Sequence, residues 1–334
     1  MSYRLAADSL RVLSRAFHDS IMGRHNDATT APVELDGPCP ITDGATLWYF
    51  GNGNDDDDDG GGGGGVCAGL DWYILAYLTV IVHVISWGIR WIVWEPASRA
   101  VARRNNHPTY DKETERKIST CLTECLFFML SGFFAYRLFV REPWLYEPYT
   151  WLHGRDVIQV LAAVKFYYLL YAARFVSDSV SLFFEVGRTA TTLIVSCVHH
   201  AVTLGLIGIA VWGNYMRGAA VIMFFFDWAD PPLLLAKSCK YMSSEPTDRF
   251  QYVANRLFEV FAVVFFLSRN VIYNYVTYIF FVTLHEGAIL ERLFLVLLAI
   301  LQTYWFALIV NAVVRRAEND GNVEDVREDP KKEQ

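Results

Sequence analysis

The chain has 334 residues, of which 53% are hydrophobic and 15% aromatic, and a formal net charge of -7. This apolar share exceeds that of ordinary soluble domains, and several apolar runs approach or exceed the roughly 20 residues that cross a bilayer. The negative charge is concentrated at the two ends, and the basic patch typical of nucleic-acid binding is absent. The composition therefore predicts one all-α, polytopic membrane domain and no nucleic-acid partner.

Residues 1–69 precede the first apolar run. They contain no stretch long enough for a signal peptide or a span. Residues 51–65 read GNGNDDDDDGGGGGG, a composition that cannot bury a core. We predict that residues 1–69 form a disordered, low-complexity segment. Within it, a short helix over 9–22 is predicted to lie on the membrane surface.

About seven membrane spans follow. The first is predicted at 70–94, with tryptophans near both ends, where their rings favour the membrane interface. The sixth is interrupted by Ser268-Arg269-Asn270, so it is either one tilted helix or two short pieces. The later spans form one membrane domain over 110–315 and are predicted at 118–140, 156–184, 190–212, 218–239, 251–280 and 288–314.

Lysine and arginine are concentrated in alternate loops. The loop after the first span is strongly basic, the loop after the fifth contains Lys240 and Arg249, and the tail opens with Arg315-Arg316. Positively charged loops stay in the cytosol, so the N-terminus is predicted to be luminal and the C-terminus cytosolic. The tail over 316–334 is acidic, and its ending Lys331-Lys332-Glu333-Gln334 is similar to the dilysine signal that returns membrane proteins to the endoplasmic reticulum. We therefore expect a multi-pass protein of the endoplasmic reticulum membrane.

Ionisable side chains lie within the fourth and fifth predicted spans. Such groups cost several kcal/mol each inside a membrane, so they indicate a partner or a function. Adjacent histidines on a helix point about 100° apart, whereas two aspartates three residues apart share a face. Pro231-Pro232 should break or bend the helix directly after the second aspartate and free carbonyls that need a cavity or water. A polar pocket within the bundle is predicted around His199, His200, Asp227, Asp230 and Lys237.

Several kinds of chemistry fit such a pocket. A carboxylate beside a histidine raises its basicity and fixes its tautomer, which suits a general base or an acyl-accepting nucleophile. A structural hydrogen bond between the two is an equally good interpretation of the spacing. A transporter is a further alternative, although the two halves of the chain show no internal repeat. A metal site is disfavoured because the other histidines lack partners at helical spacing: His18, His25, His83, His107, His153 and His285.

An ordered set of motifs runs through residues 195–275. A His-His-x-x-Thr sequence precedes a turn with a basic residue and glycine, and Asp-x-x-Asp follows with lysine seven positions on. A phenylalanine-rich helix then ends in an arginine. These positions are His199, His200, Thr203, Arg217-Gly218, Asp227, Asp230, Lys237, Asn255 to Phe266 and Arg269. The order resembles the TLC domain of ceramide synthases, with a weaker similarity over 110–315.

The chain departs from that family at three places. Phe226 stands where many members have histidine before the first aspartate. The basic cluster that usually precedes the paired histidines is reduced to Arg188, and a Lys-x-x-Glu-Ser pattern is missing after Lys117. The last two departures concern the expected contacts to coenzyme A.

The resemblance implies N-acylation of a long-chain sphingoid base by a fatty acyl-CoA, which gives (dihydro)ceramide. It implies that His199 and His200 act as base, as acyl-accepting nucleophile, or as both. Asp227 and Asp230 would then orient and stabilise an imidazolium, as a buried carboxylate does in other histidine-dependent acyl transfers. A non-catalytic lipid sensor with the same fold is the alternative.

The resemblance also implies partners. The phosphates of coenzyme A would contact four cations near the cytosolic face, namely Lys237, Lys240, Arg249 and Arg188, for which the ordinary positive-inside bias is the alternative explanation. Acyl-CoA is expected as a co-substrate, with no permanently bound cofactor and no metal. Membrane lipids and a second subunit, in a homo- or heterodimer, complete the expected partners.

Overall fold

The computed structural model describes residues 63–104, 110–151, 162–184, 189–212, 215–243, 248–284 and 288–318. Within these ranges every regular element is a helix, which confirms the predicted all-α class. The predicted surface helix over 9–22, most of the N-terminal segment, Arg188 and the tail beyond residue 318 lie outside the described residues.

The helices follow the predicted spans closely. α2 (Gly63–Ile89) continues through a π-helical turn, η1 (Arg90–Trp94), into α3 (Glu95–Arg104), so the first helix is longer at both ends than the predicted 70–94. Two short 3-10 turns, η2 (Pro143–Tyr146) and η3 (Pro148–Thr150), follow α4. The other helices are α4 (Lys112–Phe139), α5 (Ala162–Leu182), α6 (Ala190–Trp212), α7 (Met216–Phe226), α8 (Asp230–Met242), α9 (Arg249–Phe265), the π-helical η4 (Phe266–Ile272), α10 (Tyr273–Thr283) and α11 (Ile289–Glu318).

Six helical stretches among the described residues are long and apolar enough to cross a membrane, which makes this a multi-pass membrane protein. They are Trp72–Arg104, Lys112–Phe139, Ala190–Val211, Met216–Met242, Arg249–Thr283 and Ile289–Arg316. The remaining predicted span, 156–184, corresponds to α5, which is less apolar because it carries charged residues such as Arg174 and Asp178. α5 nevertheless packs against α2, α4 and α6 within the bundle.

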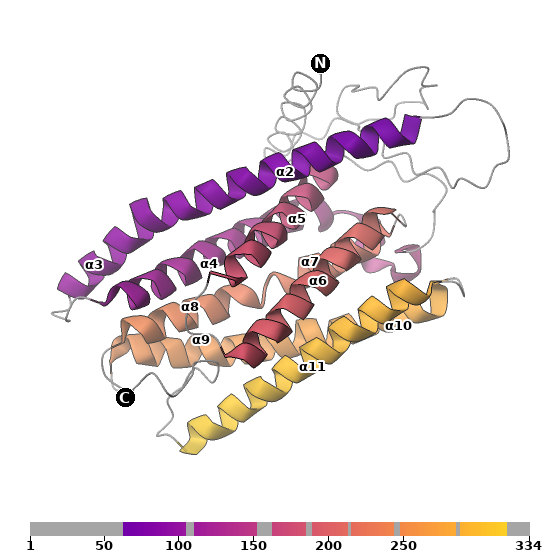
Figure 1. Ribbon diagram of the computed structural model, residues 1–334. Helices are drawn as coiled ribbons and strands as arrows, with labels where there is room; N and C mark the ends of the chain where they lie inside the picture. The colour runs from indigo at the N-terminus through magenta and orange to yellow at the C-terminus, as the bar shows by residue number, and fades with distance from the viewer. Residues whose placement is uncertain are drawn as a thin grey trace, which may run out of the picture.

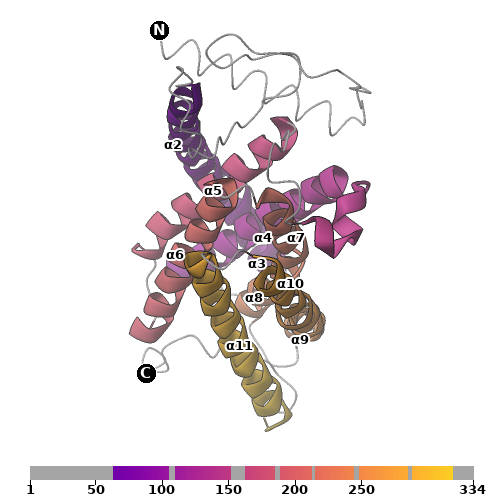
Figure 2. The same cartoon turned by 90° about the vertical axis from the view of Figure 1, so that its right-hand side faces the viewer.

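The helices run roughly alongside one another in a bundle (Figure 1). α2 lies along one edge and α11 along the opposite edge, as both views show (Figure 2). The largest packing interfaces join α4 to α8, α8 to α9, α2 to α5 and α11 to α6. In this arrangement α8 lies between α4 and α9, and α6 lies between α5 and α11.

Aromatic residues fill the centre of the bundle. Tyr167, Tyr168 and Tyr171 of α5 are buried and pack with Phe134 and Phe139 of α4. Buried aromatic rings contribute large apolar contact areas, and edge-to-face pairs add further stability. The ring of Tyr167 makes such contacts with Phe134 and Phe139.

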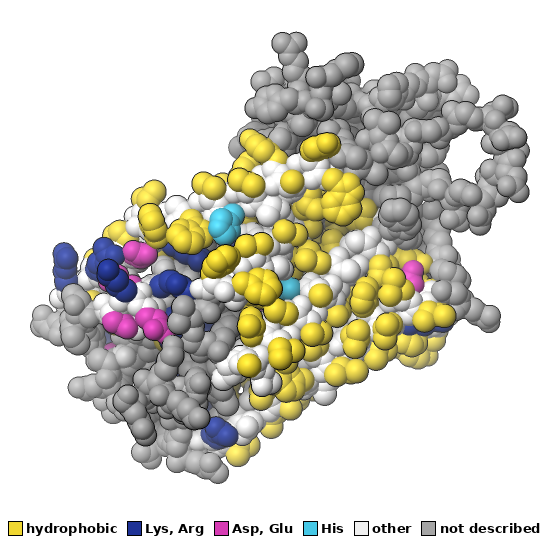
Figure 3. Space-filling model, viewed as in Figure 1, with side chains coloured by type: hydrophobic (Ala, Val, Ile, Leu, Met, Phe, Trp, Pro, Cys, Tyr) yellow, Lys and Arg dark blue, Asp and Glu magenta, His cyan; other side chains and the backbone are white. Residues whose placement is uncertain are grey.

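The outer surface has the opposite pattern to that of a soluble protein. Large apolar side chains such as Trp72, Ile92 and Phe183 are exposed, at 71%, 77% and 72%. Figure 3 shows apolar side chains along the flank, whereas lysine, arginine and acidic residues gather at one end. A flank of this kind suits contact with lipid, where exposed apolar residues need no further partner.

Local sequence determines where the helices begin. The carboxylate of Asp111 caps α4 by accepting a hydrogen bond from the backbone N–H of Thr114 at 3.0 Å. Aspartate is a favoured residue at this position because it satisfies a backbone donor that has no partner in the helix. The hydrogen bonds from Thr114 hold the pKa of Asp111 below its usual value. Asp248 caps α9 in the same way.

The interrupted sixth span is one continuous helix. α9, η4 and α10 follow one another without a break from Arg249 to Thr283. The Ser268-Arg269-Asn270 sequence lies in the π-helical segment, where the α-helical hydrogen-bond pattern is locally replaced. Short π-helical segments of this kind occur frequently at functional sites.

Candidate active site

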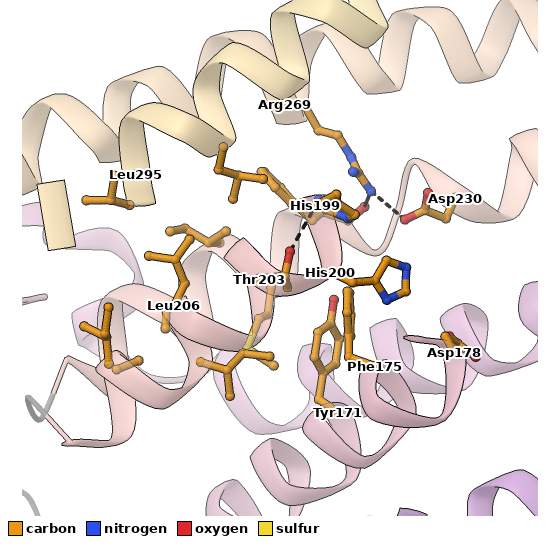
Figure 4. Close-up of a pocket in the computed structure, with 18 of the residues that line it drawn as sticks. Tyr171, Phe175, Asp178, His199, His200, Thr203, Leu206, Asp230, Arg269 and Leu295 are labelled. Atoms are coloured by element: carbon orange, nitrogen blue, oxygen red, sulfur yellow. Dashed lines mark hydrogen bonds and ion pairs between the residues drawn. The ribbon is translucent and has the colours of Figure 1, made fainter. Parts of the chain in front are cut away.

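A cavity of about 240 Å³ lies between α4, α5, α6, α7, α8, η4, α10 and α11. His199, His200 and Thr203 of α6 line it, together with Asp230 and Arg269. Leu206 and Leu295 lie on one side of the histidines, and Asp178 and Asp230 lie on the other (Figure 4). The cavity therefore has a mainly apolar end, whose wall also includes Glu291 of α11, and a charged end, with the histidines between them.

Aromatic rings surround the paired histidines. The ring of Phe175 lies 5.5 Å from that of His200 and 6.2 Å from that of His199, between centroids. Trp305 of α11 lies edge-on to His199 at 4.9 Å. These rings fix the positions of the imidazoles by packing, and the two imidazoles are nearly perpendicular to each other.

Each histidine has a hydroxyl group beside its Nδ1 atom. The Oγ of Ser179, on α5, lies 2.9 Å from Nδ1 of His200. The Oγ1 of Thr203, one turn further along α6, lies 3.4 Å from Nδ1 of His199. The contact to His200 is shorter and comes from a different helix.

The helix that carries the two aspartates breaks between them. α7 ends at Phe226, residues 227–229 form turns, and α8 begins at Asp230 with Pro231 and Pro232 in its first turn. The break therefore precedes Asp230, whereas the sequence led us to expect it directly after that residue. The reason is that a proline removes the hydrogen bond to the carbonyl four residues before it and displaces that carbonyl, so the disruption falls on the N-terminal side.

Asp227 lies deep in the bundle. Its side chain accepts hydrogen bonds from Ser131 Oγ at 2.6 Å and from Tyr171 Oη at 2.8 Å, and the residue is only 1% exposed. Tyr171 stacks on Phe175, which in turn contacts both histidines. Asp227 thus holds the aromatic wall of the cavity and is not itself among the lining residues.

Asp230 forms an ion pair with Arg269. The Oδ2 atom of Asp230 lies 2.6 Å from Nη2 of Arg269, which also donates to the carbonyl oxygen of Phe226 at 3.3 Å. That carbonyl stands at the end of α7 and also accepts a hydrogen bond from the backbone N–H of Ala229 at 3.2 Å. The guanidinium also lies over the ring of Phe226, 4.7 Å from its centroid. Phe226 therefore packs against the arginine that pairs with Asp230.

A second charged network lies at the charged end of the cavity. Arg174 of α5 is 1% exposed, and its guanidinium contacts Asp178 at 2.9 Å, Glu124 at 3.9 Å and the hydroxyl of Ser86 at 3.0 Å. It thus joins α2, α4 and α5. Glu124 and Asp178 line the cavity. We did not single out these residues from the sequence, although an arginine and an aspartate four apart in an apolar helix are a visible signal.

The order of these side chains along the chain agrees with a comparison with known families. The model of the TLC domain matches residues 117–311, which is more than half of the chain. The chain belongs to the TLC domain family. The matched region contains every residue of the cavity described above, and α2 lies outside it.

Curated ceramide synthases are similar to this chain at about one residue in four. Ceramide synthase LOH2 of Arabidopsis thaliana is 27% identical over 237 residues, which cover 66% of this chain and 77% of that protein. Ceramide synthase 4 of Mus musculus is 26% identical over 68% of this chain and 56% of its own length. Ceramide synthase 3 of Homo sapiens is 27% identical over 56% of this chain and 49% of its own length. The chain thus spans between about half and three quarters of these relatives.

The structure brings together some of the residues predicted to form the TLC-domain site. His199, His200 and Asp230 line the same cavity, whereas Asp227 lies behind Tyr171. The predicted coenzyme A ligands that the structure describes do not line the cavity; these are Lys237, Lys240 and Arg249. They lie on α8 and at the start of α9.

Arg269 is the functional candidate whose role sequence reasoning left open. The sequence pattern led us to expect it at the arginine of the TLC-domain motif, and the structure pairs it with Asp230. Among the described residues, no group of three or more histidine, cysteine, aspartate or glutamate side chains is arranged to hold a metal ion. The groups in the TLC-domain cavity can accept a proton, accept an acyl group and stabilise a nearby positive charge.

Proposed function

We propose that this protein is a ceramide synthase, which transfers a fatty acyl group from acyl-CoA to the amine of a sphingoid base. The observation that carries the proposal is the cavity in which both histidines and Asp230 meet a largely apolar lining. A fatty chain requires apolar space, and a thioester requires a neighbouring group that accepts a proton or the acyl chain. The names of its relatives, ceramide synthases at 26–27% identity, support the same activity.

The chemistry needs one proton acceptor near the thioester. The amine nitrogen attacks the thioester carbonyl carbon, a C–N bond forms, the C–S bond breaks and coenzyme A leaves as a thiolate. An imidazole takes the proton from the amine and passes it to the sulfur. If the acyl group first moves to one imidazole, the same groups act in two successive steps.

The two aspartates have different tasks in this proposal. Asp230 lies at the cavity wall, where its carboxylate offsets the positive charge of Arg269 and so makes an imidazolium less unfavourable. Asp227 is a positioning residue, because it holds Tyr171 and thereby the aromatic wall beside the histidines.

The nucleotide part of acyl-CoA stays outside the cavity in our proposal. Glu124 and Asp178 line the charged end, and their carboxylates disfavour phosphates. The cations Lys237, Lys240, Arg249 and Arg188 instead bind the phosphates at the cytosolic face. We further propose that the protein lies in the endoplasmic reticulum membrane with a luminal N-terminus and a cytosolic C-terminus, and that it forms homo- or heterodimers. The larger number of lysine and arginine side chains at one end supports this orientation (Figure 3).

The test is an assay of the purified protein in detergent with sphinganine and an acyl-CoA. We expect an N-acyl amide and free coenzyme A in equal amounts. His199→Ala and His200→Ala should each lower the rate about 100-fold or more. His83→Ala is the matched control, because His83 on α2 bonds to Ser177 and does not line the cavity.

Two outcomes would contradict the proposal. Full activity in both histidine variants would show that neither imidazole takes part in the chemistry. A folded protein that forms no amide with acyl chains of any length would favour the non-catalytic lipid sensor.

A further inference from the structure

Ser179 connects α5 to the second of the paired histidines. Its Oγ lies 2.6 Å from the carbonyl oxygen of Phe175, one turn earlier in the same helix. The same Oγ lies 2.9 Å from Nδ1 of His200 on α6. Both distances are within the normal range for hydrogen bonds.

The protons in these two contacts can be assigned by counting. A serine hydroxyl has one hydrogen, and a carbonyl oxygen has none. Two oxygens at 2.6 Å require a hydrogen between them, so Ser179 donates to Phe175. The hydroxyl oxygen can then only accept from His200. The Nδ1 atom of His200 therefore carries the hydrogen, and the lone pair of the neutral ring is on Nε2.

His199 is held less firmly by its own hydroxyl neighbour. The Oγ1 of Thr203 lies 3.4 Å from its Nδ1, at the long limit of a hydrogen bond. Thr203 is also on the same helix, whereas Ser179 reaches His200 from another helix. The two adjacent imidazoles therefore differ in how strongly the protein selects their tautomers.

We infer that Ser179 is a positioning residue that makes Nε2 of His200 the proton acceptor of the active site. The inference rests on the proposed function. Nε2 takes the proton from the attacking amine as the C–N bond forms and the C–S bond breaks, and it then gives the proton to the sulfur of coenzyme A. The Nδ1–H bond to Ser179 persists in the neutral and the protonated ring, so the proton transfer requires no rearrangement of this contact.

The first measurement is nitrogen-15 NMR of protein with labelled histidine side chains. The signals of His200 are those that disappear in His200→Gln. We expect protonated Nδ1 and unprotonated Nε2 in the unaltered protein and in Ser179→Thr, which keeps the hydroxyl. In Ser179→Ala we expect a shift toward the other tautomer. Protonated Nε2 in the unaltered protein would overturn the inference.

The second measurement is the rate of amide formation. Ser179→Ala should lower kcat about 10- to 100-fold while KM for acyl-CoA stays the same, and Ser179→Thr should restore kcat. Ser238→Ala is the matched control, because Ser238 is buried, donates to the carbonyl one turn earlier and lies away from the cavity. Unchanged kcat in Ser179→Ala would overturn the inference.

The two measurements separate this inference from the proposed function. The tautomer of His200 is observed without turnover. If the unaltered protein forms no amide, the proposed function fails, and the NMR spectrum still decides whether Ser179 sets the tautomer.

Discussion

The close approach of α7 to α10 depends on Gly218. A β-carbon at this position would lie 2.7 Å from Cε2 of Phe280 and closer still to its Cζ, whereas ordinary contacts begin at 3.4 Å. Phe280 is buried in the main core cluster and also borders the cavity, so its ring would have to shift to admit a β-carbon. Gly218→Ala should therefore strain the interface between the two helices.

The expected loss can be estimated from two opposing effects. Overpacking a well-filled core costs about 1–3 kcal/mol, and two atoms of the ring would be too close, which favours the upper part of that range. Alanine regains about 0.5–1 kcal/mol over glycine within a helix. We expect a net loss of about 2 kcal/mol, which lowers the Tm by about 3 °C in a chain of this length.

Thermal unfolding in detergent, followed by intrinsic fluorescence, measures this loss. The matched control is Gly208→Ala on α6, because a β-carbon there would meet no atom within 4 Å. That variant should be stabilised by about 0.5–1 kcal/mol. The reasoning is refuted if the two variants unfold at the same temperature. Phe280→Leu should cost less in the Gly218→Ala background than alone, because it relieves the clash.

Two further predictions concern charged groups. Asp178→Asn weakens the pairing of the buried Arg174 and should cost about 3 kcal/mol in the same unfolding assay, whereas Glu113→Gln, at an exposed ion pair, should cost less than about 1 kcal/mol. Equal losses of unfolding free energy in the two variants would contradict the argument that the buried ion pair contributes more than the exposed one. Asp111→Ala removes the cap of α4 and should cost about 1 kcal/mol at neutral pH. Because folding lowers the pKa of Asp111, its contribution is complete above the unfolded value near 4 and is lost as the pH falls through the lower folded pKa, so the two proteins should converge in acid.

The sequence predicted the helices well because membrane spans leave a strong local signal. Apolar runs of about 20 residues must form helices in lipid, since no water is present to satisfy the backbone. The interruption at Ser268-Arg269-Asn270 was visible for the same reason, and it became a π-helical segment. The apolar signal that predicted a span at α5 was weaker, because charged residues such as Arg174 interrupt it.

The site was predicted less completely, since its geometry depends on contacts between helices. Asp227 and Asp230 are three residues apart and would share a face on an unbroken helix. The break at residues 227–229 directs them to different partners, Tyr171 and Arg269. Pro231-Pro232 predicted a break in the helix, but the directions of the two aspartate side chains depend on how the helices pack. The contact of Ser179 with His200 is likewise invisible before α5 and α6 are placed side by side.

The π-helical segment η4 lies within the transmembrane helix from Arg249 to Thr283. The number of residues in η4 therefore determines the direction in which Arg269 points. A π-turn contains more residues than an α-turn, so loss of one residue between 266 and 272 could be absorbed by a return to α-helical geometry. The bundle would keep α9 and α10, but the side chain at Arg269 would rotate by up to about 100° around the helix axis. A shortened chain of this kind would remain in the membrane and lose its arginine from the cavity. Deletions here therefore differ from substitutions, because they would separate membrane insertion from catalysis.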